Sequence, residues 1–260
     1  MAIGIIGGTG VYDPKFLEDV KQIKVSTPFG MTSDLVTTGR FGDKKVVIIP
    51  RHGANHTFNP TNVPFRANLW AMKELGVTKI ISVNAVGSLK EELKPGHFVF
   101  TDQFIDRTTN REQTFYDKGK IAHISVAEPF CSGLRNILIS KGKALKYDFH
   151  EKGTCVVIEG PRFSTRAESN LFRSWGADTI NMTLVPEVVL ARESEICYAN
   201  IAMVTDYDAW KEHTVTNEEV LTTMKNNLEK VKKLLMEIIP AIDDKKVCQQ
   251  CNIALKDAMM

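Results

Sequence analysis

Short apolar runs, rich in valine and isoleucine, alternate along this sequence with longer stretches of mixed polar and apolar residues. Such alternation is typical of an α/β domain, in which strands and helices follow one another along the chain. We find no repeat or linker, so residues 1–260 are predicted to form a single domain with a C-terminal tail at 241–260. The predicted strands are Ala2–Ile6, Val46–Ile49, Lys79–Val83, Phe98–Thr101, Thr154–Ile158, Thr179–Met182 and Tyr198–Thr205.

Two helices have clear start and stop signals. Thr165 and Glu168 have the spacing of a capping box, and Gly176 is expected to end the helix that they begin. A second capping pattern at Thr216 precedes a long amphipathic helix that Pro240 is expected to end. Its apolar residues recur every three or four positions and predict a core or subunit contact. They are Leu221, Met224, Leu228, Val231, Leu235 and Ile238.

Charge and composition exclude several classes of function. The 33 Lys and Arg residues nearly balance the 31 Asp and Glu residues, so the chain lacks the broad basic field of a nonspecific nucleic-acid or membrane binder. No apolar run reaches the roughly 18–20 residues of a membrane span, and the first ten residues lack the features of a secretory signal. We therefore expect a cytoplasmic protein without nucleic-acid or membrane partners.

The five cysteines include one C-x-x-C motif, at Cys248 and Cys251. A zinc ribbon needs a second pair of ligands, and no such pair follows in the sequence. Ordinary thiols and a structural disulfide remain as alternatives. A disulfide would require an oxidising compartment or a hyperthermophilic source. The remaining cysteines are Cys131, Cys155 and Cys197.

Polar groups and glycines follow six of the apolar runs directly. In α/β sheets, ligands bind at the carboxyl ends of the strands. Six such segments therefore predict one composite site rather than six unrelated turns. The segments are 7–10, 50–53, 84–88, 159–163, 181–183 and 206–208.

The residue types in these segments suit a phosphate-sized anion. Guanidinium, hydroxyl and imidazole groups together with backbone N–H groups beside glycines are the donors that such an anion needs. These residues are Thr9, Arg51, His52, His56 and Thr183.

A second group of residues suits a planar base. Asp206 and Asp208 are two positions apart and share a face of an extended chain. Paired carboxylates can bind a metal, accept hydrogen bonds from amino groups or transfer protons, but no further ligands with metal-site spacing accompany them. Phe163 offers an aromatic face to a ring.

The familiar glycine-loop and hydrolase motifs are absent. The segment from Gly8 to Asp13 places Asp where the dinucleotide-binding motif needs its third glycine. The sequence contains no P-loop, no H-E-x-x-H zinc motif and no G-x-S-x-G nucleophile motif.

Taken together, the motifs resemble those of the S-methyl-5′-thioadenosine phosphorylases, a group within the trimeric purine nucleoside phosphorylase family. The resemblance runs in order through nearly the whole chain and is greatest toward archaeal members. The motifs are Gly7-Gly8-Thr9-Gly10, Pro50-Arg51-His52-Gly53, Ala85-Val86-Gly87-Ser88, residues 102–108, Glu159-Gly160-Pro161-Arg162-Phe163, Asn181-Met182-Thr183 and Thr205-Asp206-Tyr207-Asp208.

The resemblance implies a fold, an assembly and a reaction. The fold would be a nucleoside phosphorylase α/β domain with a mixed, partly barrel-like sheet flanked by helices. The chain would form a homotrimer or a dimer of trimers, with active sites completed by a neighbouring subunit. Methylthioadenosine and inorganic phosphate would give adenine and 5-methylthioribose 1-phosphate, without a metal or an organic cofactor.

The resemblance also assigns roles to individual residues. Thr9, Arg51, His52, His56, Asn84, Ala85 and Thr183 match the phosphate site. Phe163, Ser164, Met182, Asp206 and Asp208 match the base and ribose site. His123 of a neighbouring subunit and Val220 match the pocket for the methylthio group.

Three departures from the family pattern stand out. Asn84 replaces the usual Thr or Ser of the phosphate site, and the loop from Glu212 to Glu219 looks shorter than in animal members. The short, cysteine-bearing tail resembles that of archaeal members and favours disulfides. In that light, Cys131 and Cys197 form a second candidate pair beside the C-x-x-C motif.

The mechanism implied by the resemblance gives Asp206 the role of general acid at N7 of adenine, with its pKa raised by burial and by Asp208. The same carboxylates favour the 6-amino group of adenine over a 6-oxo group. A broad purine nucleoside phosphorylase that also accepts adenosine and inosine is the main alternative. A methylthioinosine phosphorylase, a hydrolase and a non-catalytic nucleoside-binding protein are weaker alternatives.

Overall fold

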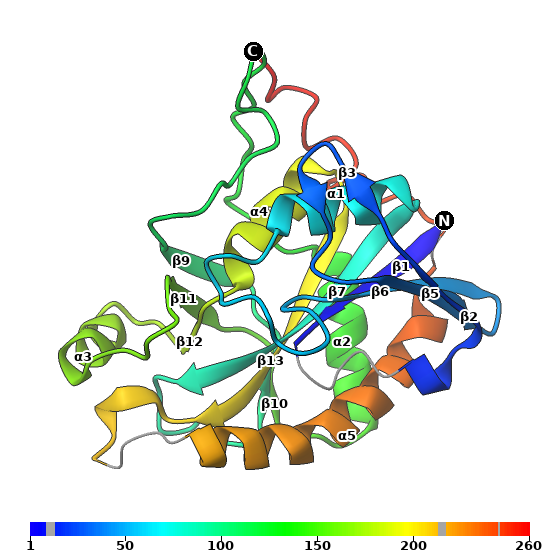
Figure 1. Ribbon diagram of the computed structural model, residues 1–260. Coiled ribbons are helices and arrows are strands. Elements are labelled where there is room, and N and C mark those ends of the chain that lie inside the picture. The colour runs from blue at the N-terminus through cyan, green and yellow to red at the C-terminus, as the bar shows by residue number, and fades with distance from the viewer. Residues whose placement is uncertain (9–13, 213–216, 244) are drawn as a thin grey trace.

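A mixed eleven-stranded sheet forms the centre of the protein (Figure 1). The computed structural model describes residues 1–260 except 9–13, 213–216 and 244, and it leaves the side chains of residues 217 and 219–221 undescribed. The main path of the sheet follows the order β10-β8-β13-β7-β1-β6-β5-β2, and β9, β11 and β12 branch from it. The fold predicted from the alternating pattern is therefore confirmed.

The strands of the main path vary greatly in length. Their bounds are β1 Ala2–Gly7, β2 Glu18–Ile23, β5 Val36–Phe41, β6 Lys44–Pro50, β7 Val77–Ser88, β8 Phe98–Val99, β10 Phe149–His150 and β13 Cys197–Asp206. The branch contains β9 Gln103–Arg107, β11 Thr154–Ile158 and β12 Thr179–Asn181, and a separate hairpin joins β3 Ser26–Thr27 to β4 Gly30–Met31.

Two long parallel strands, β7 and β13, are neighbours in the main path of the sheet, and β7 also connects this path to the branch. Residues 79–87 of β7 pair with β13, and the last residues of β7 then pair antiparallel with β12. At Gly87, the pairing of β7 with β13 ends and its pairing with β12 begins. A Cβ atom on Gly87 would lie 3.0 Å from Asp206 Oδ1 and 3.2 Å from Asp208 Cβ. The absence of a side chain there lets the end of β13 approach β7 closely.

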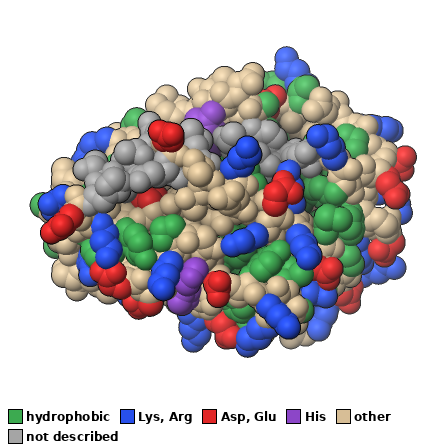
Figure 2. All heavy atoms as spheres, turned by 90° about the horizontal axis from the view of Figure 1, so that it is seen from below, with side chains coloured by type: hydrophobic (Ala, Val, Ile, Leu, Met, Phe, Trp, Pro, Cys, Tyr) green, Lys and Arg blue, Asp and Glu red, His purple; other side chains and the backbone are tan. Residues whose placement is uncertain are grey.

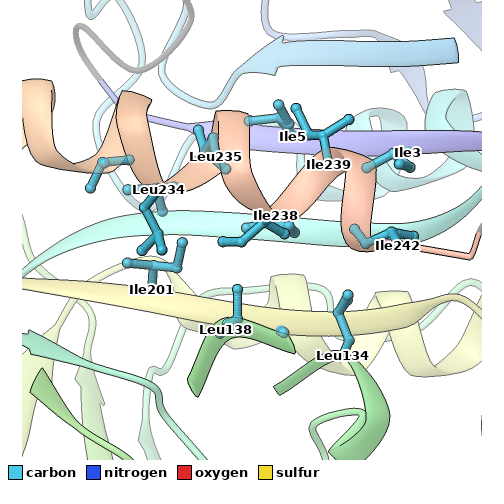
Figure 3. Close-up of a cluster of buried hydrophobic side chains, with 14 of the residues drawn as sticks. Ile3, Ile5, Leu134, Leu138, Ile201, Leu234, Leu235, Ile238, Ile239 and Ile242 are labelled. Atoms are coloured by element: carbon cyan, nitrogen blue, oxygen red, sulfur yellow. The ribbon is translucent and has the colours of Figure 1, made fainter. Parts of the chain in front are cut away.

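Helices cover both faces of the sheet, as expected for strands that are apolar on both sides. On one face, α2 Ser132–Ala144 and α5 Asn217–Ala241 pack on alternate strand residues such as Ile3, Ile5 and Ile201 (Figure 3). On the other face, α1 Phe65–Glu74 and α4 Leu184–Glu193 pack on Ile6, Val47 and Ile49. The remaining helix, α3 Arg166–Ser174, lies beside the short turn η2 Asp208–Trp210, and the turn η1 spans Pro14–Phe16.

The helix signals in the sequence are confirmed at one helix and partly corrected at the other. Thr165 accepts a hydrogen bond from the N–H of Glu168 and completes a capping box with it, and Gly176 has a left-handed φ of 82° just beyond the helix. Pro240 was expected to end the long helix, but it lies in the last turn of α5, which ends at Ala241. Pro240 cannot donate an i→i−4 hydrogen bond and its ring crowds the preceding turn, and the helix extends only one residue beyond it. Thr216 lies outside the described residues.

The surface agrees with the near-neutral net charge. Basic and acidic side chains are interspersed on the face seen in Figure 2, without a continuous field of one sign. None of the helices in the described ranges combines the length and apolar character that a membrane span requires.

Candidate active site

The predicted site residues begin where β1 and β6 end side by side. Gly7 pairs with both Pro50 and Val83, so the ends of β1 and β6 lie beside the middle of β7. The N–H of Arg51 donates to the carbonyl oxygen of Gly7 at 2.8 Å. Thr9 follows β1 but lies outside the described residues. The fold therefore brings Arg51 to the edge of the sheet where the sequence predicts it.

Arg51 is almost completely buried, with 1% of its surface exposed, and forms a two-pronged ion pair with Glu187. Its Nε lies 2.7 Å from Oε2 of Glu187, and its Nη2 lies 3.0 Å from Oε1. Burial lowers the pKa of Arg51, but the charge and hydrogen bonds of Glu187 outweigh it and leave the pKa above its ordinary value. The guanidinium is thus a permanently charged group in a fixed orientation.

Glu187 is the residue of this cluster that the sequence analysis missed. Besides Arg51, its carboxylate accepts hydrogen bonds from the hydroxyls of Ser82 and Tyr198, each at 2.7 Å. Arg51 and Ser82 lie 136 and 105 positions from Glu187 in sequence, so no local motif predicts these contacts. One signal was visible, because Glu187 is a single carboxylate in the otherwise apolar segment 184–191.

Asn84 connects this ion-pair cluster to Thr183. Its Nδ2 donates to Oγ1 of Thr183 at 2.7 Å, and its Oδ1 accepts hydrogen bonds from Ser82 and Asn200. Because the hydroxyl oxygen of Thr183 accepts from Asn84, its own proton can be donated to another acceptor. Asn84 thus fills the position of the usual Thr or Ser with a group that orients Thr183. Ala85 follows Asn84 in β7 and is half-buried opposite Met203.

His52 and His56 stack with their ring centroids 4.3 Å apart. Nδ1 of His52 lies 2.9 Å from the carbonyl oxygen of Phe58, so it carries the proton and leaves Nε2 as the other polar atom of the ring. Burial and the charge of Arg51 lower the pKa of His52 to about 4. This histidine is therefore neutral at pH 7, and a bound anion beside it would raise its pKa.

Asp206 and Asp208 lie together at the end of β13. Thr205 Oγ1 donates to one oxygen of Asp206 at 2.7 Å, and the N–H of Asp208 donates to the other at 2.8 Å. Asp208 is 4% exposed, and burial raises its pKa despite the hydroxyls of Ser169 and Ser164 that face it. Both carboxylates line a cavity of about 840 Å³ that extends to the first turns of α5.

Of the residues predicted to contact the base and ribose, the structure places Ser164 beside this pair. Ser164 is buried and faces Asp208, whereas Phe163 is 47% exposed. Met182 packs against Gly160, where a Cβ atom would lie only 2.5 Å from the sulfur of Met182. Val220 lies in the first turn of α5, but its side chain is outside the described part of the structure.

Arg111 is a second residue that the sequence analysis missed. Its side chain donates to the carbonyl oxygens of Met182, Val185 and Glu159 at 2.6–2.7 Å. The carboxylate of Glu159 lies within 3.4 Å of Arg111 Nε. Burial raises the pKa of Glu159, but backbone and side-chain hydrogen bonds prevail and hold it near 2. Arg111 thereby fixes the backbone at Met182, the predicted ribose contact, and at Val185 and Glu159.

The structure places His123 beside the C-terminal tail of its own chain. It is exposed, its N–H donates to the carbonyl oxygen of Ala258 at 2.8 Å, and the adjacent Ala122 forms a β-bridge with Met259. The C-terminus projects from one end of the molecule in Figure 1, away from α3 and the end of β13. A role for His123 in the site of a neighbouring subunit stays a prediction.

The polar cluster around Arg51 and the carboxylate pair both lie along β7 and β13 of the mixed sheet, as one composite site requires. Residues 2–240 match the profile of the Phosphorylase superfamily, and the chain belongs to that family. It is similar to S-methyl-5′-thioadenosine phosphorylases from Thermofilum pendens, with 55% identity over 99% of this chain and 98% of the relative, and from Pyrococcus furiosus, with 56% identity over 95% of each. The resemblance seen in the motifs is therefore confirmed.

A solved structure supports the same assignment. Methylthioadenosine phosphorylase from Schistosoma mansoni in complex with adenine superposes with a TM-score of 0.94 at 40% identity, covering 99% of this chain and 98% of that one. A variant of the adenosine/methylthioadenosine phosphorylase of the same organism, in complex with methylthioadenosine, matches with the same TM-score.

The ion pair predicts that two buried carboxylates of α4, Glu187 and Glu193, contribute very different amounts to the free energy of unfolding. Replacing Glu187 with Gln leaves the charge of Arg51 buried without compensation, so we expect a loss of about 3–5 kcal/mol in the free energy of unfolding. Glu193 is a matched control, because it is 2% exposed and its hydrogen-bond donors among the described residues are the neutral Thr114 Oγ1 and the N–H of Phe115. Glu193→Gln should cost about 1 kcal/mol. Urea unfolding measures both, and equal losses would contradict the role given to Glu187.

The neutral His52 predicts a pH dependence of stability. As pH falls from 6.5 toward 4, the unfolded chain binds a proton at His52 while the folded chain does not, so the folded state loses stability in this window. The loss in the free energy of unfolding should be about 3 kcal/mol across this window, and no such loss should occur above pH 6.5. Comparing urea unfolding of the wild type and His52→Asn between pH 4 and pH 7 tests this, and parallel pH profiles would refute it.

Proposed function

We propose that this protein catalyses the phosphorolysis of S-methyl-5′-thioadenosine to adenine and 5-methylthioribose 1-phosphate. The observation that carries the proposal is the joint placement of two clusters by β7 and β13. Arg51, Asn84 and Thr183 form the first cluster, and Asp206 with Asp208 forms the second. The names of the relatives and the complexes of the Schistosoma mansoni enzymes with adenine and methylthioadenosine support it.

Phosphate is the proposed co-substrate and nucleophile. The hydroxyl of Thr183, oriented by Asn84, would donate to it, and the fixed charge of Arg51 would attract it. As the glycosidic bond breaks, its electron pair leaves with adenine and the sugar acquires positive charge. A phosphate oxygen held beside the anomeric carbon stabilises that charge and then forms the new bond.

The carboxylate pair is proposed to protonate the departing base and to recognise its 6-amino group. Asp206, held by Thr205 and by the N–H of Asp208, would deliver a proton to N7 of adenine. Asp208 is the more buried of the two, and its raised pKa favours one shared proton over two charges in this pair. A carboxylate also accepts from the 6-amino group, whereas a 6-oxo group would place acceptor against acceptor.

The assembly and setting belong to the same proposal. We propose a homotrimer, in which His123 of one subunit reaches the methylthio end of the substrate bound to its neighbour. The chain would act in the cytoplasm as a single domain, and the reaction would need no organic cofactor and no metal at the carboxylate pair. The exposed position of His123, on a segment paired with the C-terminal tail, supports its role between subunits.

A broader nucleoside phosphorylase is the second candidate function. The adenosine/methylthioadenosine phosphorylase of Schistosoma mansoni, whose name includes adenosine, favours it at 40% identity. Such an enzyme would share the phosphate cluster and the carboxylate pair, so the two candidates differ in how the 5′ substituent is recognised.

The deciding measurement is adenine release from methylthioadenosine with and without phosphate, beside parallel reactions with adenosine and inosine. We expect release only with phosphate, fastest with methylthioadenosine and slowest with inosine. Equal rates with adenosine would establish the broader candidate. Phosphate-independent release would contradict both, since the phosphate cluster would then have no role.

The role of Asp206 predicts a large loss of rate. Asp206→Asn removes the proposed proton donor while keeping the size of the side chain, so kcat should fall by about 10²–10⁴-fold. Asp43→Asn is a control, because Asp43 lies in the exposed turn between β5 and β6 with 81% of its side chain exposed. Steady-state kinetics at saturating phosphate measures the effect. Full turnover by Asp206→Asn would refute the assignment.

A further inference from the structure

Four of the five cysteines meet in one place outside the active site. The sulfur atoms of Cys131, Cys197, Cys248 and Cys251 all lie within 4.8 Å of one another, and three of the four residues are buried. Three separate parts of the chain supply them. Cys131 is the residue before α2, Cys197 begins β13, and the C-x-x-C pair lies in the tail after α5.

We propose that these four cysteines bind a zinc ion as a structural tetrathiolate site. In tetrahedral zinc sites the Zn–S distance of about 2.3 Å places the sulfurs about 3.8 Å apart. The sulfurs of Cys131 and Cys248 are 3.9 Å apart. Thiolates are soft ligands, and a tetrahedral set of four sulfurs selects zinc or iron–sulfur chemistry over the hard cations.

The fold supplies the second ligand pair that the sequence lacks after the C-x-x-C motif. Zinc-ribbon spacing requires two pairs close in sequence. Here Cys131 and Cys197 lie upstream, 66 positions apart. The N–H of Cys131 donates to the carbonyl oxygen of Tyr198 at 2.9 Å, which holds Cys131 beside the start of β13, where Cys197 lies. This is why the spacing argued against zinc and the structure argues for it.

The surroundings of the cluster suit a negatively charged metal site. Each thiol releases its proton when it binds zinc, so the complete site carries a net negative charge. Nη1 of Arg192 lies 3.8 Å from Sγ of Cys251.

Two disulfides, the pairing that the family resemblance favours, would use the same residues. All five cysteines are unbonded in the structure, and a disulfide needs sulfurs about 2.05 Å apart. Two disulfides require closeness within each pair only. The mutual approach of all four sulfurs is what a single central ligand requires, and it favours the metal.

The site would connect the tail to the segment that carries His123. Beyond Cys251, the tail pairs with that segment through Ala122 and Met259 and through the N–H of His123. Zinc would therefore fix the beginning of the tail, at Cys248 and Cys251, to the start of α2 and to β13. Resting on the proposed function, loss of zinc should raise the KM for methylthioadenosine more than it lowers kcat.

The test begins with the metal content of the full-length chain, purified without chelators and under reducing conditions. Elemental analysis should find about one zinc per chain. Cys248→Ser combined with Cys251→Ser should lower this to less than about a tenth, since structural zinc sites use all four ligands. Cys155→Ser is the matched control, because Cys155 is a buried cysteine in β11 outside the cluster, and it should retain the metal.

A second measurement uses the wild-type chain, so it does not depend on the folding of any variant. Cobalt(II) added to the metal-free, reduced chain should give the absorption bands of tetrahedral thiolate coordination, and zinc should displace them. Thermal unfolding should occur at a lower temperature without metal. Metal content, cobalt spectrum and unfolding are independent of catalysis, so a failure of the proposed function would not alter them.

Two results would overturn the proposal. One is a reduced wild-type chain that holds no zinc and gives no thiolate bands with cobalt. The other is a chain whose intact mass lacks four hydrogens as isolated, because its cysteines are then joined as two disulfides.

Discussion

The buried ion pair between Arg51 and Glu187 is the interaction on which the rest of the site depends. Two charges can stay in a protein interior only if each satisfies the other and the remaining polar atoms find partners. Here those partners are Ser82 in β7 and Tyr198 in β13. The pair therefore orders side chains from four elements, and Asn84 carries that order to Thr183. The donors proposed for phosphate are thus in place before any ligand arrives, which reduces the cost of binding it.

The long parallel strands β7 and β13 explain how one chain holds two different clusters so close together. Asn84 and Gly87 lie three positions apart on β7, so one strand contacts the ion-pair cluster and, further along, the carboxylate pair. The nucleophile and the departing base must lie on opposite sides of the bond that breaks. A rigid pair of strands between the two clusters fixes their separation, and the missing side chain at Gly87 lets the carboxylates sit directly against the sheet.

Much of this could be predicted from the sequence, and the failures have physical causes. The strand Thr154–Ile158 and the capping box at Thr165 were predicted at their observed positions, because both depend on local pattern alone. Strand β2 was missed because nearly all its residues are exposed and give no apolar alternation. Arg51, Asp206 and Asp208 follow buried strands and could be found by position. Glu187 and Arg111 could not, since their partners lie distant in sequence and only the fold brings them together.

The cysteine cluster also could not be predicted from the sequence alone, because only half of its residues lie in a local motif. A ligand set is recognised from sequence when all its members share one local motif, and this chain has only half of one at Cys248 and Cys251. The other half comes from the start of β13 and from the residue before α2, as the partners of Glu187 include residues of β7 and β13. Both clusters join distant elements. The Arg51–Glu187 cluster does so through a buried ion pair, and the cysteine cluster does so through thiols. The Arg51–Glu187 cluster would position phosphate, and the cysteine cluster would hold the tail that positions His123.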